Sequence, residues 1–282
     1  MVSSPRIAIA ALMALVSGCP HRDKEPPIWE QVKIGEIGAT GQGQAPLRLN
    51  TTNLDVHVFQ IPSDRVRELH GLWDALSTRQ VRYKSHQAFR SNAFRAARCS
   101  LQQWDWVLGS LKEVGANKTA TLTQWLSAGD NGDVAITPVR KAQNISFTDM
   151  DGRPAQVGLA PGRLVLRLGL ERMGSAGPAR QLVACPVFTV PTGGALPQIA
   201  AMAKAKEVAF WGAAFSASLR EGDVLVLGPE DYYGDPSTLG GLFFCDPQEA
   251  LVVEGGKGQT VQRRRAVRIY VLVCTHLSEG VP

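Results

Sequence analysis

Hydrophobic and polar residues alternate along residues 54–61, whose sequence is Leu-Asp-Val-His-Val-Phe-Gln-Ile. A period of two is typical of a β-strand with one buried face, and Pro62 is expected to end it. The next apolar residues recur at helical spacing, after a possible cap at Ser63 or Asp64. They are Val66, Leu69, Leu72, Trp73 and Leu76. The pattern predicts a strand followed by an amphipathic helix.

Two further apolar segments, Val81–Tyr83 and Ala93–Cys99, predict short strands. Ser100 and Gln103 have the spacing of a capping box, in which each side chain bonds the backbone of the other residue. The helix that they start has an apolar stripe made of Leu101, Trp104, Leu108 and Leu111. Residues 51–116 are therefore predicted to form a small βαββα module.

The rest of the chain, residues 117–282, consists mostly of short strand-like segments between turn-forming clusters, with a helical interruption at Ile199–Lys206. The predicted strands are Thr119–Trp125, Val134–Val139, Ile145–Thr148, Leu164–Leu170, Leu182–Val190, Val208–Phe215, Val224–Leu227 and Val267–Cys274. The expected fold class is α+β, a βαββα module followed by a larger, mostly antiparallel β domain.

The start of the chain predicts export. Arg6 precedes the apolar run Ile7–Val16, which is too short to cross a bilayer as a helix of about 20 residues, and Cys19 follows small residues. This order resembles the bacterial lipobox, which implies a signal peptide at residues 1–18, cleavage before Cys19 and lipidation of its thiol. The alternative is an ordinary secreted protein with a chance cysteine at this position.

Residues 19–50 are rich in proline, glycine and glutamine and predict a flexible tether between the lipid and the folded part. Pro20 stands where the simplest inner-membrane retention signal has an aspartate, so by analogy we expect a lipid anchor in the outer membrane, facing the periplasm. The net charge of +5 contains no long block of one sign. We expect no nucleic-acid partner for such an exported, tethered chain.

The densest basic cluster comprises Arg263–Arg265 and Arg268. It fits either a contact with anionic lipid or cell-wall polymer, or charges that protect the edge of a hairpin. Four cysteines follow Cys19, and an oxidising compartment would permit disulfides among them. They are Cys99, Cys185, Cys245 and Cys274, which allow three pairings or could remain buried thiols.

The sequence lacks the common catalytic and metal-binding motifs. The histidines form no HExxH pair, and neither a GxSxG elbow nor a Walker-type loop is present. The acidic clusters at Asp130–Asp133 and Asp149–Asp151 fit either calcium ligands or hairpin turns. Residues Glu230–Tyr233 fit either a carboxylate and phenol site or a surface loop. We therefore expect a non-catalytic protein without a metal or other cofactor.

Several segments resemble, in order, parts of the secretins, multimeric outer-membrane channels of bacterial secretion systems and type IV pili. They are the module at residues 54–114, Asp130–Ile136, Arg220–Gly228, Thr238–Phe243 and Arg268–Thr275. The resemblance implies a channel-like or assembly component that forms homo-oligomeric rings or binds an envelope protein. It also implies structural or assembly roles for Leu225, Leu227, Leu239, Gly240, Leu242 and Phe243.

Two other functions fit the sequence. A monomeric periplasmic or surface lipoprotein could bind a partner protein or a cell-wall polymer through an exposed apolar or basic patch. An exported enzyme could instead have a site scattered along the chain, for example around Asp231 and His276, in a concave pocket with perturbed acids. These hypotheses predict a ring-sized oligomer, a monomer and a pocket, respectively.

Overall fold

The computed structural model describes residues 51–127, 129–171, 180–190, 201–202, 204–231, 234–253 and 262–278. These residues belong to one compact unit, Arg48–Pro282. The predicted signal peptide, Cys19 and the predicted tether lie outside the described residues.

The larger sheet is built around its longest strand, β14. Its strand order is β3-β12-β14-β1-β4, and β13 pairs with another part of β14. The bounds are β1 (Thr51–Pro62), β3 (Phe94–Ser100), β4 (Asn117–Ser127), β12 (Asp223–Pro229), β13 (Cys245–Val253) and β14 (Gln262–Leu277). Because β14 joins segments from both ends of the described chain, the sheet forms only when distant residues meet.

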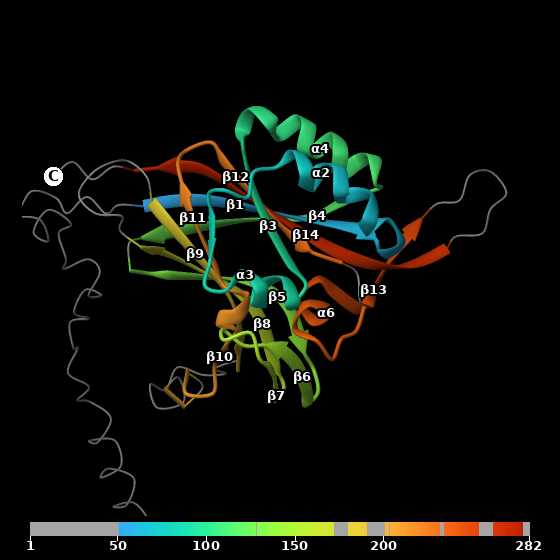
Figure 1. Cartoon of the computed structure of the whole chain (residues 1–282), viewed down its shortest axis with the longest axis vertical. Coiled ribbons are helices and arrows are strands. Elements are labelled where there is room, and N and C mark those ends of the chain that lie inside the picture. The colour runs from blue at the N-terminus through green and yellow to red at the C-terminus, as the bar shows by residue number, and fades with distance from the viewer. Residues whose placement is uncertain are drawn as a thin grey trace, which may run out of the picture. The chain divides into compact units, whose positions relative to one another are not determined.

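A second sheet packs below the first one, as Figure 1 shows. Its order is β2-β11-β9-β8-β5, with β10 beside β9. The bounds are β2 (Val81–Tyr83), β5 (Asn131–Val139), β8 (Gly162–Glu171), β9 (Arg180–Thr189), β10 (Val208–Ala209) and β11 (Phe215–Leu219), and a separate hairpin consists of β6 (Gln143–Thr148) and β7 (Pro154–Leu159). All pairs of named strands are antiparallel, so the predicted α+β class with mostly antiparallel strands is confirmed.

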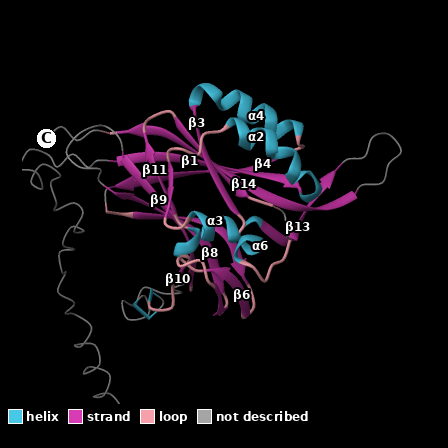
Figure 2. Ribbon diagram, viewed as in Figure 1, coloured by secondary structure: helices cyan, strands magenta, loops and turns pink. Residues whose placement is uncertain are grey.

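Short helices complete the unit. Figure 2 shows α2 and α4 above the first sheet and α3 and α6 lower down. The α-helices are α2 (His70–Ala75), α3 (His86–Ser91), α4 (Trp104–Glu113) and α6 (Leu239–Phe244), and the 3-10 helices are η1 (Ser63–Leu69), η2 (Leu101–Gln103) and η3 (Trp211–Ala213). The predicted capping box between Ser100 and Gln103 is present where η2 begins.

The core between the layers contains a cluster of aromatic rings. Phe94 contacts Phe243 and Phe244, with ring centroids 4.9 and 4.8 Å away, and Tyr270 lies 5.5 Å from Phe243. The six residues that the sequence assigned structural or assembly roles are all buried here: Leu225, Leu227, Leu239, Gly240, Leu242 and Phe243. Because they lie inside the unit, they stabilise it from within and present no surface to a neighbour.

Gly240 shows how closely α6 packs. A Cβ atom at this position would lie 2.3 Å from the carbonyl oxygen of Asn92 and 2.8 Å from the Cβ of Ala93. Asn92 in turn fixes the hairpin, because its side-chain amide donates to the carbonyl of Thr148 and its side-chain oxygen accepts from the amide of the same residue, both at 2.8 Å. Any side chain at position 240 would therefore displace this buried junction.

The predicted boundary between residues 116 and 117 does not separate two compact units. The strands of the predicted βαββα module pair outside it: β1 with β14 and β4, β2 with β11, and β3 with β12. Local apolar patterns locate these strands correctly, but they carry no information about which distant strand each one joins. Residues 51–116 are thus part of the same two-sheet unit as the rest.

The predicted strand Val208–Phe215 is interrupted in the structure. Val208 and Ala209 pair with β9, the next residues form η3, and β11 begins only at Phe215. Gly212 explains the close packing of this interruption, because a Cβ there would lie 2.3 Å from the carbonyl oxygen of Thr148. The chain therefore uses a short turn to pass from one pairing to the next.

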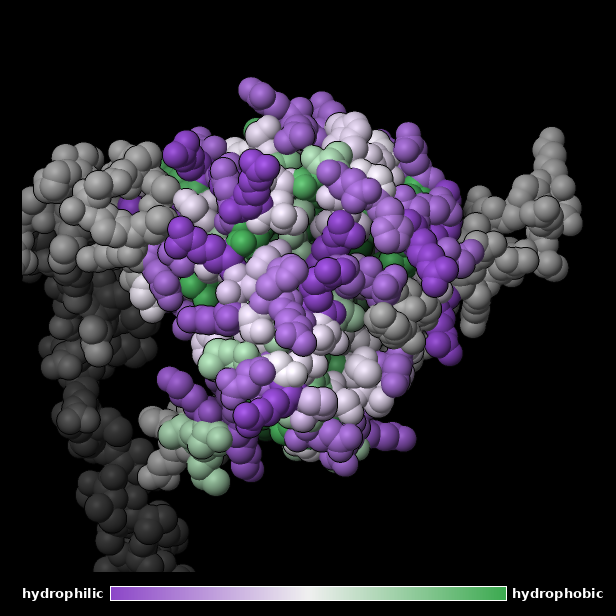
Figure 3. All heavy atoms as spheres, in the orientation of Figure 1, coloured by the Kyte–Doolittle hydropathy of each residue, from purple (hydrophilic) through white to green (hydrophobic). Residues whose placement is uncertain are grey.

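The face of the molecule shown in Figure 3 carries mostly hydrophilic and intermediate residues, with hydrophobic ones in small separate spots. Within the described part of the chain, no helix has the length and apolar character needed to cross a membrane.

Candidate functional site

The exposed edge of β4 is the first candidate site. Ten of its residues have partners on β1, from Thr51↔Ser127 to Gln60↔Asn117. No described strand pairs with its other edge. A free strand edge presents a row of backbone amide and carbonyl groups that can pair with another chain. The edge of β4 is therefore a candidate binding surface made by the backbone.

The opposite end of the first sheet is covered. The backbone of Ser77 exchanges two hydrogen bonds with that of Arg98 on β3, at 3.0 and 2.8 Å. The hydroxyl of Tyr83 donates to the carbonyl of Ala96 at 3.1 Å, which occupies a second acceptor on the same strand. Burial and the nearby Glu230 carboxylate raise the pKa of Tyr83 to about 12, so this donor keeps its proton at neutral pH. This end of the sheet offers little room for a further strand.

The other edge strands carry features that discourage pairing. In β5 these are Asp133, Pro138 and a register shift between Ala135 and Thr137. In β13 they are two acids and a proline in the segment Cys-Asp-Pro-Gln-Glu, again with a register shift. The strands β2 and β10 have three and two residues, and β7 begins with a proline. Charges, prolines, bulges and shortness are the usual protections of a sheet edge.

β4 has few of these protections. It is eleven residues long with the sequence Asn-Lys-Thr-Ala-Thr-Leu-Thr-Gln-Trp-Leu-Ser, which contains a single charged residue and no proline. Its register shift lies at the N-terminal end, where Val58 pairs with Ala120 and Phe59 with Lys118, so that Thr119 is skipped. The run Ala120–Ser127 is regular. We call this run and its exposed side chains the β4 surface.

Apolar side chains on both faces of the β4 surface reach solvent. Trp125, on the outer face opposite Asn53, is 76% exposed. Leu122 is opposite the fully buried Val56, yet it is 38% exposed because β4 forms the rim of the two-sheet unit. Exposed large apolar residues beside an unpaired edge are typical of a protein interaction site. The β4 surface thus combines backbone groups with apolar contacts.

A polar row lies beside Trp125 on the outer face. The hydroxyl of Thr123 donates to Asp55 at 2.7 Å, and Thr121 Oγ1 lies 3.0 Å from His57 Nδ1. The indole of Trp104 from α4 packs against the ring of His57, with centroids 5.3 Å apart. Burial, together with the nearby Lys118, lowers the pKa of His57. The imidazole of His57 is therefore neutral near pH 7. The contacts within this polar row hold its side chains in place without a ligand.

A second candidate site is a pocket of about 410 Å³ on the second sheet. Its lining includes the apolar residues Val183, Cys185, Val187 and Ala209, the indole of Trp211, and the carboxylates of Asp130 and Glu171. An adjoining pocket of about 320 Å³ shares Glu171, Val183 and Trp211 with it. The arrangement suits a ligand with an apolar body and a cationic group.

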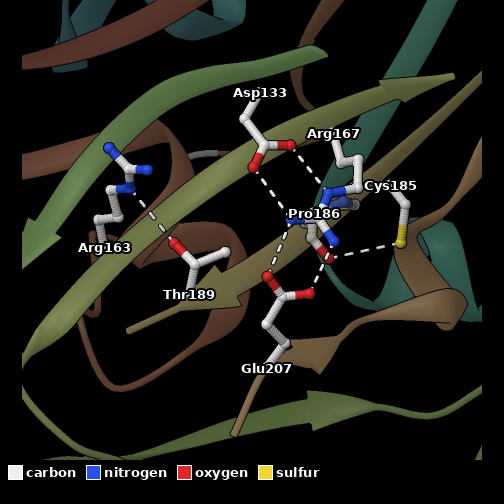
Figure 4. Close-up of polar contacts among 7 residues, drawn as sticks. All are labelled: Asp133, Arg163, Arg167, Cys185, Pro186, Thr189 and Glu207. Atoms are coloured by element: carbon white, nitrogen blue, oxygen red, sulfur yellow. Dashed lines mark hydrogen bonds and ion pairs between the residues drawn. The ribbon is translucent and has the colours of Figure 1, made fainter. Parts of the chain in front are cut away.

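Arg167 forms the polar side of this pocket. Figure 4 shows its guanidinium group between the carboxylates of Asp133 on β5 and Glu207 before β10. Its Nε and Nη2 donate to Asp133 at 2.8 and 3.0 Å, and its Nη1 and Nη2 donate to Glu207 at 2.8 and 3.1 Å. These bonds raise the pKa of Arg167, which is charged at every accessible pH. Arg167 is fully engaged in joining three segments.

A polar pocket of about 360 Å³ includes His70, His86, Tyr83, Arg90 and Glu230. Three of its polar side chains already have partners in the chain: Arg90 forms an ion pair with Glu230, and the Tyr83 hydroxyl donates to a backbone carbonyl. The rings of Tyr83 and His86 pack edge to face with centroids 5.1 Å apart. This arrangement holds α3 against its neighbours and offers no activated nucleophile.

The residues suggested for an enzyme are not brought together. Leu227 on β12 pairs with Tyr270, and His276 lies six positions farther along β14, about 20 Å away at the rise of a strand. Asp231 follows β12 in the opposite direction, while His276 faces Glu221 at 3.6 Å. Glu230 forms an ion pair with Arg90, and the tyrosines at 232 and 233 lie outside the described residues.

The acidic cluster at Asp149–Asp151 forms a turn, whereas in the cluster at Asp130–Asp133 the residues from Asn131 onward belong to β5. The carboxylate of Asp149 accepts from the amides of Asp151 and Arg153 at 2.9 and 2.8 Å, and Gly152 has a φ of +81°. Asp133 contacts Arg167. In the described ranges no group of three or more His, Cys, Asp or Glu side chains could hold a metal ion. The turn interpretation therefore accounts for the hairpin between β6 and β7.

The four described cysteines are free thiols. Cys99 pairs with Val224 and Val224 with Val273, so Cys99 and the neighbouring Cys274 are two strands, roughly 9–10 Å, apart, too far for a disulfide. Burial raises the pKa of Cys99 and Cys245 to about 11 and that of Cys185 and Cys274 to about 12. These thiols are therefore protonated and unreactive at neutral pH.

The basic cluster is divided by the structure. Arg268 is buried and donates to the carbonyl of Ile136 on β5 at 2.7 Å, which links β14 to the second sheet. Arg263, Arg264 and Arg265 lie in the part of β14 that pairs with β13, opposite Val252, Leu251 and Ala250. Their place in an outer strand pair fits the charges that protect a hairpin, while Arg268 has a structural role.

Sequence reasoning missed both candidate sites. The strand predicted at Thr119–Trp125 corresponds to β4, but whether a strand is central or at an edge depends on distant pairing. Arg167, Asp133 and Glu207 are separated by tens of residues and match no motif. Comparisons with protein-family models, curated proteins and solved structures found no match to this chain. The geometry of these surfaces is therefore the basis on which a function can be proposed.

The ion pairs of Arg167 predict a loss of stability in the variant Arg167→Met. Methionine fills similar space but leaves the carboxylates of Asp133 and Glu207 facing each other without a cation. Because the Arg167 side chain is 26% exposed, we expect a loss of about 2–3 kcal/mol, below the ~3–5 of a fully buried pair. Chemical denaturation measures the free energy of unfolding.

The matched control is Arg163→Met on the same strand. Arg163 donates a single hydrogen bond to Thr189 at 3.3 Å, so its loss should cost only about 0.5–1 kcal/mol. Equal losses for the two variants would show that the ion-pair network contributes nothing beyond the packing of the side chain.

Proposed function

We propose that this protein is a non-catalytic component of the bacterial cell envelope that assembles with a partner through the β4 surface, while a lipid on Cys19 holds it at the membrane. The single observation that carries the proposal is the free edge of β4. Its run Ala120–Ser127 is regular and uncharged, and it includes the exposed Leu122 and Trp125. A partner that pairs there would satisfy the backbone groups and cover both apolar side chains.

The contrast between β4 and the other edges supports selection for binding. The edges of β2, β3, β5, β7, β10 and β13 are short, charged, bulged, covered or interrupted by proline, and the other side of the six-residue β6 is bridged at Ser146 by Thr238. Natural proteins use such features to prevent unwanted pairing between sheets. The eleven-residue β4 is open while the other edges are protected. This difference is consistent with binding of a partner at the β4 edge.

The membrane location is supported by the sequence around Cys19. A lipid at the first mature residue and a tether of about thirty residues would let the folded unit move some 30 Å from the membrane while remaining attached. The proposal retains the assembly role and the location that the sequence suggested, but it makes no use of a separate ring-building module.

A second candidate function is that of a monomeric lipoprotein that binds a partner or polymer. The pocket beside Trp211 favours it, since the apolar floor around Val183 and the carboxylates of Asp130 and Glu171 could hold an amine-bearing ligand. The indole of Trp211 is 48% exposed and could cover an apolar or sugar-like surface. This candidate needs no contact at β4.

Photo-crosslinking tests the proposed assembly role. A photoreactive phenylalanine analogue replaces Trp125 in cells that express the lipidated chain, and the same analogue at Met150, in the turn between β6 and β7, is the matched control. We expect a discrete adduct from position 125 and none from position 150, because only the β4 surface holds a partner.

The variant Leu122→Lys places a charge on the open edge and should abolish that adduct. Leu101→Lys makes the same chemical change at a 51% exposed residue outside the sheet, before α4, and should leave the adduct unchanged. Absence of any adduct at position 125, or an adduct that survives Leu122→Lys, would refute an assembly role for β4.

The lipid anchor is tested by Cys19→Ser. Without the thiol the chain has no lipid attachment point, so most of it should move from the membrane pellet to the soluble fraction after cell lysis. Ser17→Ala, which retains a small residue in the segment before the cysteine, is the control and should leave the protein in the pellet. A Cys19→Ser protein that remains in the pellet would contradict lipid anchoring.

A further inference from the structure

We infer that the partner at the β4 surface is a second copy of this chain, bound by antiparallel pairing of β4 with β4 about a two-fold axis at one of the residues Leu122–Gln124. The inference rests on the proposed function and names its partner. Symmetric dimers are the commonest homo-oligomers, and their interface must be complementary to itself.

The β4 surface meets this condition in its charges. Lys118 is the single charged residue of the strand. With the axis at Leu122, the two Lys118 residues would be separated by eight strand positions, or about 26 Å, and by more for an axis farther along. The paired region would therefore contain no opposed like charges, which destabilise cross-strand pairs.

The side chains are also compatible. A two-fold axis perpendicular to the sheet places outer-face residues of one copy beside outer-face residues of the other. With the axis at Leu122, Thr121 would face Thr123, and Trp125 would face the threonine at position 119. Threonine pairs and aromatic contacts with β-branched residues both stabilise antiparallel strands. Leu122 would meet its own copy and lose its contact with water.

The rest of the sheet limits the assembly to two copies by this route. A ring or filament built by strand pairing needs two different open edges on each subunit. The far edge, β3, is occupied by the backbone of Ser77 at Arg98 and by the hydroxyl of Tyr83 at Ala96. The remaining outer strand of this sheet, β13, has a register shift and a proline. Among the described edges of the first sheet, growth is therefore expected at β4, and a β4–β4 pair closes it.

Attachment to a membrane would make pairing between two copies more favourable than it is for the same copies free in solution. Copies held on one membrane by tethers of similar length share a thin layer, which raises their effective concentration. A heterologous partner would have to present an unprotected edge of its own, whereas each copy of this chain brings one.

Single cysteines test the pairing in the full-length chain carrying Cys19→Ser. Leu122→Cys, Thr123→Cys and Gln124→Cys are compared with Thr119→Cys, whose two copies would be at least six positions, about 20 Å, apart. The buried native thiols, whose pKa values are about 11 or 12, should give little background. After mild oxidation, non-reducing electrophoresis measures the disulfide-linked dimer.

We expect one of the three central variants to form the dimer at least tenfold faster than Thr119→Cys, and light scattering of the Cys19→Ser chain at high micromolar concentration to give twice the monomer mass. Leu122→Lys in the same background should give the monomer mass, and Leu101→Lys the dimer mass. Equal rates at all four cysteines, or a monomer for the unmodified surface, would overturn the inference.

The outcomes separate this inference from the proposed function. An adduct at Trp125 in cells together with a monomeric purified chain would mean that β4 binds a different protein, which overturns self-pairing and leaves the assembly role standing. Absence of both the adduct and the dimer would overturn the two proposals together.

Discussion

The outermost strand of an open sheet has backbone amide and carbonyl groups without a strand partner. How each outer strand protects or exposes these groups determines which surfaces of this molecule can bind another chain. The central strand β14 satisfies its own groups by pairing with β1, β12 and β13. The unpaired backbone groups are therefore those of the outer strands. Proline, acids, short length and local hydrogen bonds protect most of them, and β4 remains as the exception on which the functional argument depends.

The core holds in place the sheet to which the β4 surface belongs. The aromatic cluster around Phe94, Phe243 and Tyr270 fixes α6 and the inner face of the first sheet, while Arg167 and Arg268 join the second sheet to its surroundings. A binding edge is useful only when it is rigid, because ordering a strand on binding costs conformational entropy. Since β4 is already held along β1 over most of its length, little of this cost remains.

Sequence patterns predicted the individual elements better than their arrangement. Alternation located β1, a strand-like segment located β4, and the Ser100–Gln103 spacing located the start of the helix, because these signals are local. Pairing is not local: β1 joins β14 across more than two hundred residues, so local patterns could not show that residues 51–116 belong to the same compact unit as the rest. Trp125 and Arg167 were missed for the same reason, since exposure at an edge and an ion-pair network arise only in the folded chain.

Hydrogen exchange of the β4 amides measures whether this edge is open in a single chain and covered when a second copy binds. Alternate amides of an edge strand point away from its neighbour. In Ala120–Ser127 we expect these to exchange rapidly in dilute protein and slowly in concentrated protein, while the amides that face β1 remain protected in both. Slow exchange of both sets at every concentration would show that the edge is already covered within one chain, and rapid exchange of the outward set at every concentration would show that no copy binds there.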